Sequence, residues 1–204
     1  AGPAYHFLKD ADLVFAIGSS LTDHGLVTPI PSGKILIHAT NDPVDLHKSY
    51  LVDHPILGDA KLVLCQFIDC CEDLLGEKAH FGREGVADHI SNLREAWLAE
   101  WMPKLTSWEV PINPYRVIWE LMQVANPAET IITHDSGNPR DQMVPFFEAV
   151  APKTYMGWGN STPLGTGLGL ALGAKMAAPD KLCINVMGDT AAGTALLDIE
   201  TAVR

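Results

Sequence analysis

A short apolar segment near the C-terminus of the chain is followed by an aspartate, whose side chain is a carboxylate. Residues 183–187 (CINVM) have the composition of a buried strand, and Gly188 and Asp189 follow them directly. In an open parallel α/β sheet, ligands bind at the carboxyl ends of the strands. A carboxylate at that edge can hold Mg²⁺, while backbone amides of the small residues that follow can receive phosphate oxygens. The segment therefore predicts a metal-assisted phosphate site, although an aspartate here is also a common helix N-cap.

A glycine-rich segment precedes this strand pattern. Residues 157–173 contain six glycines, of which Gly165, Gly169 and Gly173 are spaced four apart. On a helix these three would form one stripe where another backbone can approach closely. The first two glycines precede the predicted helix, where loop N–H groups can contact a ligand. The spacing fits neither a dinucleotide-binding GxGxxG motif nor a P-loop, so close packing and ligand binding both stay open for this segment.

Together with the sequence before them, these motifs resemble the thiamine diphosphate-dependent enzymes of the acetolactate synthase and 2-oxoacid decarboxylase group. The resemblance to the central domain of that group covers residues 11–18, 35–38, 42–43 and 57–64. Residues 129–204 are similar to the first half of its diphosphate-binding domain. The resemblance implies thiamine diphosphate and Mg²⁺ as cofactors.

The same resemblance implies roles for individual residues at the strand end. Gly188 and Asp189 correspond to the start of the GDG motif of the group, in which the aspartate is a Mg²⁺ ligand. Thr190 and Ala191 match the residues that contact the diphosphate, and Thr190 stands where the group has glycine. Asp189 is thus the single metal ligand expected in this chain.

Further cofactor contacts are implied upstream. Leu164 matches the bulky apolar residue that supports the bent cofactor, with Gly165 beside it, and the carbonyl of Thr162 would accept a hydrogen bond from the aminopyrimidine. Gly137 and Asn138 match a loop near the diphosphate, where Asn138 departs from the Gln-His of the group. No catalytic residue is identified, because the activating glutamate and the second Mg²⁺ ligand of the group have no counterpart in these residues.

The function implied by the resemblance is decarboxylation or carboligation of a small 2-oxo acid by a homodimer or homotetramer. Which 2-oxo acid is used does not follow from the sequence, and FAD binding is found in some relatives without support here. The alternative is a non-catalytic α/β nucleotide-binding or regulatory module that has kept the fold, for which Thr190 is the supporting residue. We expect the 204 residues to be an internal piece of a longer enzyme and to be inactive alone.

Alternating apolar and helical patterns predict the elements that would position these residues. Short apolar runs favour buried parallel strands at residues 12–18, 34–39, 130–134 and 181–187. Helical spacing predicts helices at residues 43–50, 59–75, 86–101, 115–124, 142–150, 164–178 and 196–204. Asp42 and Asp59 are the predicted N-caps of the first two helices.

The order of these elements indicates an α/β fold with two doubly wound parallel-sheet units, both incomplete. We assign residues 1–78 to a central domain, 79–113 to a linker with a helix, and 114–204 to the thiamine diphosphate-binding domain.

Charge and composition exclude several kinds of partner. The chain carries a net charge of -11, which repels nucleic acids and anionic membranes. No apolar run approaches the roughly 20 residues that span a bilayer. The four cysteines lack the spacing of a zinc site and are predicted to be reduced core thiols: Cys65, Cys70, Cys71 and Cys183. We therefore expect a soluble cytoplasmic protein that binds neither nucleic acid nor membrane.

Overall fold

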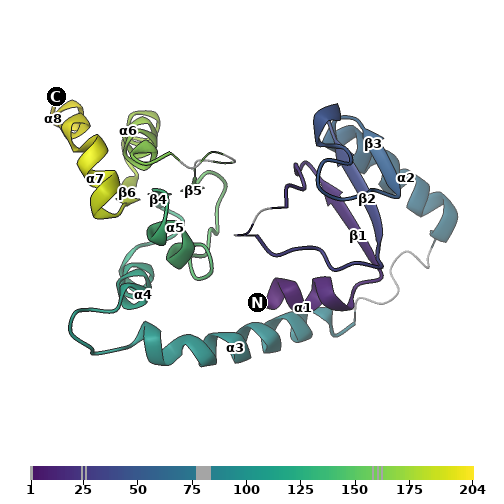
Figure 1. Cartoon of the computed structure of the whole chain (residues 1–204), viewed down its shortest axis with the longest axis horizontal. Helices are drawn as coiled ribbons and strands as arrows, with labels where there is room; N and C mark the ends of the chain where they lie inside the picture. Colours follow the sequence, from purple (N-terminus) through teal and green to yellow (C-terminus); the bar gives the residue numbers. More distant parts are fainter. Residues whose placement is uncertain are drawn as a thin grey trace. The chain divides into compact units, whose positions relative to one another are not determined.

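The chain folds into two compact units, residues 1–98 and 99–204. The computed structural model describes residues 2–23, 25, 27–76, 84–157, 159, 161 and 163–204. Each unit contains a three-stranded parallel sheet flanked by helices (Figure 1). The fold is α/β with parallel sheets, as the sequence predicts.

The first unit is built on a sheet with the order β1-β2-β3. Its strands are β1 (Leu13–Ile17), β2 (Ile35–Thr40) and β3 (His54–Leu57). Helix α1 (Pro3–Asp10) precedes β1, and α2 (Ala60–Leu75) follows β3. The predicted helix at 43–50 is one short turn, η1 (Pro43–Asp45), because Leu46 is extended and His47 has a left-handed backbone with φ 58°.

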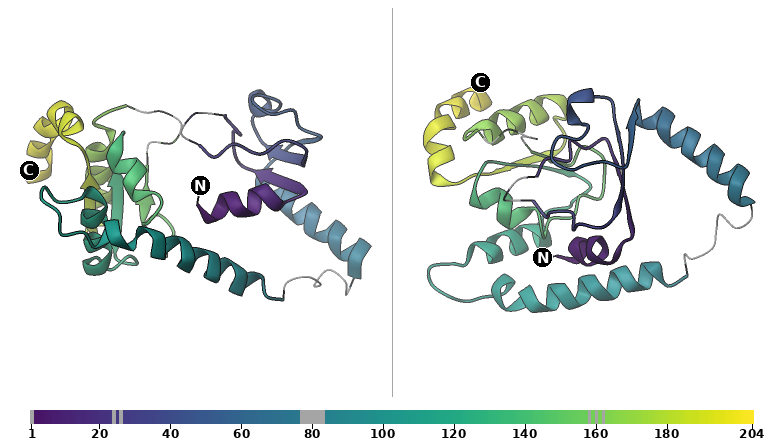
Figure 2. Two further views of the ribbon diagram at one scale, coloured as in Figure 1. Left: turned by 60° about the horizontal axis from the view of Figure 1, so that its bottom comes forward. Right: turned by 45° about the vertical axis from the view of Figure 1, so that its right-hand side comes forward.

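The second unit is built on a sheet with the order β5-β4-β6. Its strands are β4 (Thr130–His134), β5 (Tyr155–Met156) and β6 (Leu182–Val186). The helices are α3 (Val86–Leu105), which begins in the first unit, α4 (Pro114–Val124), α5 (Asn138–Met143), α6 (Thr166–Ala177), α7 (Asp189–Ala195), η3 (Leu196–Asp198) and α8 (Ile199–Val203). Within this unit α6 lies on one side of the strands and α5 on the other (Figures 1 and 2).

Two helix predictions in the second unit are wrong in their bounds. The helix expected at 142–150 instead begins at Asn138 and ends at Met143, because Gly137 and Pro139 start it early. Helix α3 continues past the predicted end at 101, through Pro103, to Leu105. Leu105, the last residue of this helix, is fully buried.

The two sheets differ in burial. All five residues of β4 are buried, so this strand is the centre of the second unit. In the first unit the buried apolar residues are few: Leu36, Ala39, Val52 and Val63. Among the described residues, no helix is long and apolar enough to cross a membrane.

The cysteine prediction is half wrong. All four thiols are free, as predicted, but Cys65, Cys70 and Cys71 are exposed and Cys183 is only partly covered. The first three lie on α2, of which Val63 alone is buried among the described residues, so most of this helix faces away from the core. They are therefore surface thiols and not core residues.

Candidate functional site

The carboxyl ends of β4 and β6 lie side by side. The two strands pair in parallel up to His134 and Val186, and the amide of Asp135 donates to the carbonyl of Val186 at 2.9 Å. A Cβ placed on Gly188 would lie 4.0 Å from Cγ of Pro139. The loop that follows β4 and the loop that follows β6 therefore adjoin. The structure brings together two groups of residues that the sequence had linked only through a resemblance.

Both loops lead into helices whose N-cap residue is a glycine, which has no side chain to cap the first amides. Gly137 is the N-cap of α5, and Gly188 is the N-cap of α7. Gly137 has φ 85°, a left-handed conformation that glycine adopts at little cost. Since the first N–H groups of a helix have no acceptor within it, amides at the start of α5 and α7 can bind an anion, except that of Thr190, which donates to Oδ1 of Asp189.

Asp189 supplies a carboxylate at the same edge. Its side chain is exposed, and its Oδ1 accepts a hydrogen bond from the amide of Thr190 at 2.8 Å. Among the described residues, Oδ2 accepts no hydrogen bond. Hard cations such as Mg²⁺ prefer oxygen ligands and retain water and phosphate ligands, so one protein carboxylate can suffice. This donor set fits Mg²⁺ with a diphosphate, although the described part of the chain holds no group of three metal-ligating side chains.

The two residues after Asp189 differ in exposure, since Thr190 is exposed and Ala191 is buried. Thr190 lies in the first turn of α7 without a positive φ, so threonine replaces glycine here without backbone strain. Ala191 is only 1% exposed, so both its side chain and its backbone are covered in this structure. The departure from the GDG pattern therefore leaves the helix start intact.

Asp135 is a site residue that the sequence interpretation did not single out. Its carboxylate is fully buried. Oδ1 accepts from the amide of Ser136 at 2.8 Å and from that of Gly165 at 3.0 Å, and Oδ2 accepts from the amide of Gly167 at 3.0 Å. Asp135 thus caps the start of α6 from the loop that follows β4. An aspartate directly after a buried strand, with a glycine at the start of a later helix, is the sequence pattern that could have indicated it.

Gly167 is the glycine at which α6 comes closest to the sheet. A Cβ at this position would lie 2.5 Å from Oδ1 of Asn185 and 2.9 Å from the backbone of His134. A Cβ on Gly169 or Gly173 would have no heavy atom of the described residues within 4 Å. The predicted packing stripe therefore holds at Gly165, whose Cβ would lie 3.0 Å from Oγ1 of Thr194 in α7, and is wrong for Gly169 and Gly173 among the described residues, because α6 contacts the sheet through a face that contains Gly167.

Leu164 and Gly165 form the start of α6. Leu164 is 46% exposed, so its side chain is not a core residue. Gly165 has φ 92°, and its amide donates to Asp135, so this amide is already occupied within the protein. Thr162 lies outside the described residues. The structure thus fixes the backbone on which Leu164 is placed, immediately next to the bonds made by Asp135.

Aromatic rings line the inner side of this edge. The His134 ring lies 5.3 Å from that of Tyr155, and a Cβ on Gly157 would fall 2.5 Å from Nε2 of His134. Burial raises the pKa of Tyr155 to about 12, partly offset by the positive charge of Arg140. Tyr155 is therefore neutral at ordinary pH. These rings are packed into the wall of the site.

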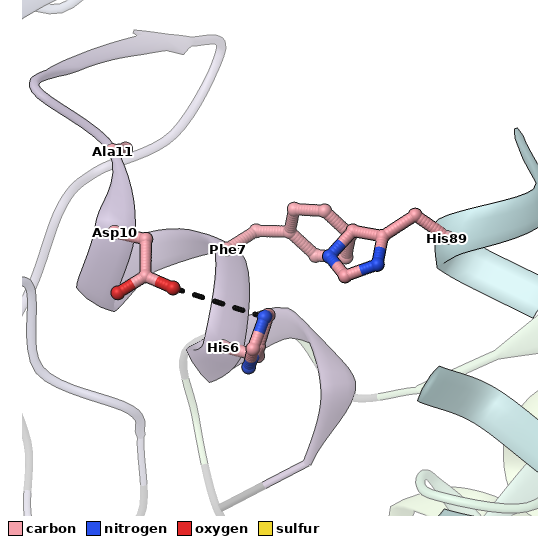
Figure 3. A pocket seen from close by; sticks show the side chains of 5 residues that line it. All are labelled: His6, Phe7, Asp10, Ala11 and His89. Atoms are coloured by element: carbon pink, nitrogen blue, oxygen red, sulfur yellow. Dashed lines mark ion pairs between the residues drawn. The ribbon is translucent and has the colours of Figure 1, made fainter. Parts of the chain in front are cut away.

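A hollow in the first unit lies away from the carboxyl ends of the strands (Figure 3). It is lined by His6, Phe7 and Asp10 of α1, by Ala11 directly after this helix, and by His89 of α3. Nε2 of His6 lies 3.7 Å from Oδ2 of Asp10, and the two histidine rings are 5.5 Å apart. These side chains do not form a metal-binding group. The hollow therefore offers fewer groups that could bind a ligand or a metal than the edge formed by the carboxyl ends of β4 and β6.

Two family models match most of the chain. Residues 1–67 match the thiamine pyrophosphate enzyme central domain, and residues 135–204 match the thiamine pyrophosphate enzyme C-terminal TPP binding domain. Thiamine pyrophosphate is a synonym of thiamine diphosphate. The second match contains Asp135, Gly165 and Asp189, so it covers the site described above.

Curated relatives extend the similarity over nearly the whole chain. The chain is 30% identical to a probable acetolactate synthase large subunit of Methanococcus aeolicus, over 92% of this chain and 32% of the relative. It is 28% identical to the acetolactate synthase isozyme 3 large subunit of Escherichia coli strain K12, over 97% of this chain and 34% of that protein. It is also 29% identical to a sulfoacetaldehyde acetyltransferase of Alcaligenes xylosoxydans xylosoxydans, over 98% of this chain and 37% of that protein.

The chain thus spans about a third of the length of these relatives, whose names describe more than one reaction. What they share with this chain is the pair of matched domains. The chain belongs to the thiamine pyrophosphate enzymes and carries sequence of two of their domains, the central domain and the C-terminal TPP binding domain.

Proposed function

We propose that this chain binds the diphosphate end of thiamine diphosphate through Mg²⁺ and serves the decarboxylation or carboligation of a small 2-oxo acid. The observation that carries the proposal is the juxtaposition of Asp189 with the starts of α5 and α7, whose N-caps are glycines. An exposed carboxylate suits the metal, and free amides suit phosphate oxygens. Similarity to acetolactate synthase large subunits supports the 2-oxo acid as substrate class.

Each residue of the site has a distinct part in this proposal. Oδ2 of Asp189 would hold Mg²⁺, since Oδ1 is bonded to the amide of Thr190. Amides at the start of α7 and α5, including that of the exposed Asn138, would bind the diphosphate oxygens. Leu164, half-exposed at the start of α6, would support the organic part of the cofactor by shape. When bound, the cofactor supplies the electron sink for cleavage next to the substrate carbonyl.

The oligomeric state is part of the proposal. We infer a homodimer or homotetramer from the resemblance to the acetolactate synthase group, in which the cofactor lies between two chains. A role for FAD has no support in the residues of the first unit and is not proposed.

The test measures thiamine diphosphate binding by isothermal titration of the complete gene product, with and without Mg²⁺. We expect Mg²⁺-dependent binding together with turnover of a 2-oxo acid such as pyruvate. The 204-residue chain alone, checked for folding by circular dichroism, should bind the cofactor weakly or not at all and should show no turnover. Tight binding and turnover by the isolated chain would contradict the view that it is part of a larger site.

One alternative has its own supporting residue. Thr190, in place of the glycine of the family, favours a non-catalytic module that has kept the fold. That function predicts that the complete gene product binds no thiamine diphosphate at any Mg²⁺ concentration. Reading the gene on both sides gives a faster indication, because the enzyme requires an asparagine-containing metal motif after Asp189 and a glutamate upstream.

A further inference from the structure

The carboxylate of Asp135 joins two loops that the proposed cofactor site uses for different purposes. One loop follows β4 and contains Gly137 and Asn138, on the diphosphate side. The other leads into α6 and contains Leu164. Asp135 accepts from Ser136 in the first loop and from Gly165 and Gly167 in the second. A single side chain therefore connects the backbones of both loops.

The geometry makes this carboxylate a strong connection. It is fully buried, so water does not compete for its oxygens. Hydrogen bonds from amides to a carboxylate are shorter and stronger than those between neutral groups. The single N–H of Gly165 is shared between both oxygens, at 3.0 and 3.1 Å, so the backbone next to Leu164 is bonded directly to the carboxylate.

A second contact near Asp135 restricts the same helix start. The hydroxyl of Thr133 donates to the carbonyl of Gly167 at 2.9 Å, one strand position before His134. Gly167 itself leaves no space for a Cβ against the backbone of His134. These contacts oppose a shift of the first turn of α6 along the sheet, and they connect the backbone next to Leu164 to β4.

We propose that Asp135 is a positioning residue for thiamine diphosphate, which sets Leu164 at a fixed distance from the diphosphate-binding loop. This inference rests on the proposed function. It assigns to Asp135 no contact with the cofactor, because its oxygens are fully used by backbone amides. Its effect should appear on the organic part of the cofactor, which Leu164 supports, and not on the diphosphate.

Asp135→Asn is the appropriate variant because it keeps the shape of the side chain. The amide NH₂ would face a backbone N–H where the carboxylate had an oxygen, so at least one of the three amides loses its acceptor. The matched control is Asp180→Asn, at an exposed aspartate in a turn of the same unit. Both variants lose one negative charge.

The experiment compares two ligands with the complete gene product in the presence of Mg²⁺: thiamine diphosphate and inorganic pyrophosphate. Asp135→Asn should weaken thiamine diphosphate binding by about tenfold, the equivalent of one charge-assisted hydrogen bond. Pyrophosphate binding should change by less than about twofold, within the usual error of additivity. In a Leu164→Ala background, Asp135→Asn should add less than about twofold, because both changes then act on the same contact.

The outcomes separate this inference from the proposed function. Unchanged affinity for both ligands in Asp135→Asn would overturn the inference and leave the proposed function standing. An equal loss for both ligands would also overturn it, because Asp135 would then maintain the diphosphate loop or the fold as a whole. If the unaltered protein binds neither ligand, the proposed function fails and the inference fails with it.

A measurement on the unaltered protein keeps the inference testable if Asp135→Asn does not fold. Hydrogen exchange followed by mass spectrometry reports on peptides that contain Gly165 and Gly167. Thiamine diphosphate with Mg²⁺ should slow their exchange more than pyrophosphate with Mg²⁺ does, because only the former is expected to contact Leu164. Equal slowing by both ligands would overturn the inference.

Discussion

The helices that follow the carboxyl edges of the two sheets differ in their N-cap residues. In the first unit, Asp42 accepts from the amide of Val44 at 3.0 Å, and Asp59 accepts from Lys61 and Leu62 at 2.9 and 3.1 Å. In the second unit the corresponding N-caps are glycines without a side-chain cap: Gly137, Gly165 and Gly188.

This difference shows where a phosphate can bind. An aspartate cap uses the helix N–H groups and places a negative charge at the point that an anionic ligand would occupy. A glycine cap leaves these donors free and lets a ligand approach the backbone. The first unit is therefore closed to an anion at the capped helix starts. In the second unit the start of α5 has no side-chain cap, Asp189 accepts from one amide of α7 through Oδ1, and Asp135 closes the start of α6.

The largest effect is expected from Asp189→Ala in the complete gene product. Removal of the carboxylate should weaken Mg²⁺-dependent thiamine diphosphate binding by about 100-fold, as expected for loss of a charged ligand worth about 3 kcal/mol. Isothermal titration measures the affinity, and Asp180→Ala is the control because this aspartate is exposed in the same unit. Unchanged affinity in Asp189→Ala would show that the edge formed by β4 and β6 is not the metal site.

Gly167→Ala should have the next largest effect, on the stability of the second unit. The added Cβ would meet Asn185 and the His134 backbone at 2.5 and 2.9 Å, and overpacking of this kind costs about 1–3 kcal/mol. Gly169→Ala is the matched control. Its Cβ meets no described atom, so alanine should stabilise α6 by about 0.5–1 kcal/mol. Urea unfolding measures both, and equal effects would contradict the close approach at Gly167.

These contrasts also explain which features the sequence could predict. The caps at Asp42 and Asp59 are local patterns, with the acceptor two or three residues from the donor, so they were predictable and are confirmed. The four strands expected from apolar runs are also confirmed within a residue or two. Strand β5 has only two residues, which is too short to produce a periodic pattern.

The features that the sequence missed depend on distances between elements. Asp135 and Gly165 are 30 residues apart, and no local pattern indicates that their loops meet. The choice between Gly167 and the stripe that contains Gly169 depends on which face of α6 contacts β4. The exposed thiols of α2 were missed because a helical apolar pattern does not reveal how much of the helix is covered. The site residues Gly188 and Asp189 were accessible from the resemblance alone.

Leu164→Ala tests whether this side chain supports the cofactor at the edge formed by β4 and β6. Loss of the contact made by this half-exposed side chain should lower turnover by roughly tenfold, and thiamine diphosphate affinity by a smaller factor. Because the side chain is 46% exposed, the free energy of unfolding should fall by less than about 2 kcal/mol, the lower limit for a fully buried leucine. Steady-state kinetics per folded molecule and urea unfolding separate these effects. A larger loss of stability with normal turnover would make Leu164 a core residue.

The smallest effect, and the control for the whole comparison, is Asp59→Ala in the first unit. This change removes the acceptor of two amides at the start of α2 and should lower the stability of that unit by about 1 kcal/mol. It also uncovers helix N–H groups at a strand end, which makes the first unit resemble the second at this point. Since no carboxylate equivalent to Asp189 would remain beside them, we expect thiamine diphosphate affinity to be unchanged in isothermal titration of the complete gene product. A change of about tenfold or more would mean that the cofactor depends on the edge of the first sheet, and the contrast between capped and uncapped helices would no longer identify the site.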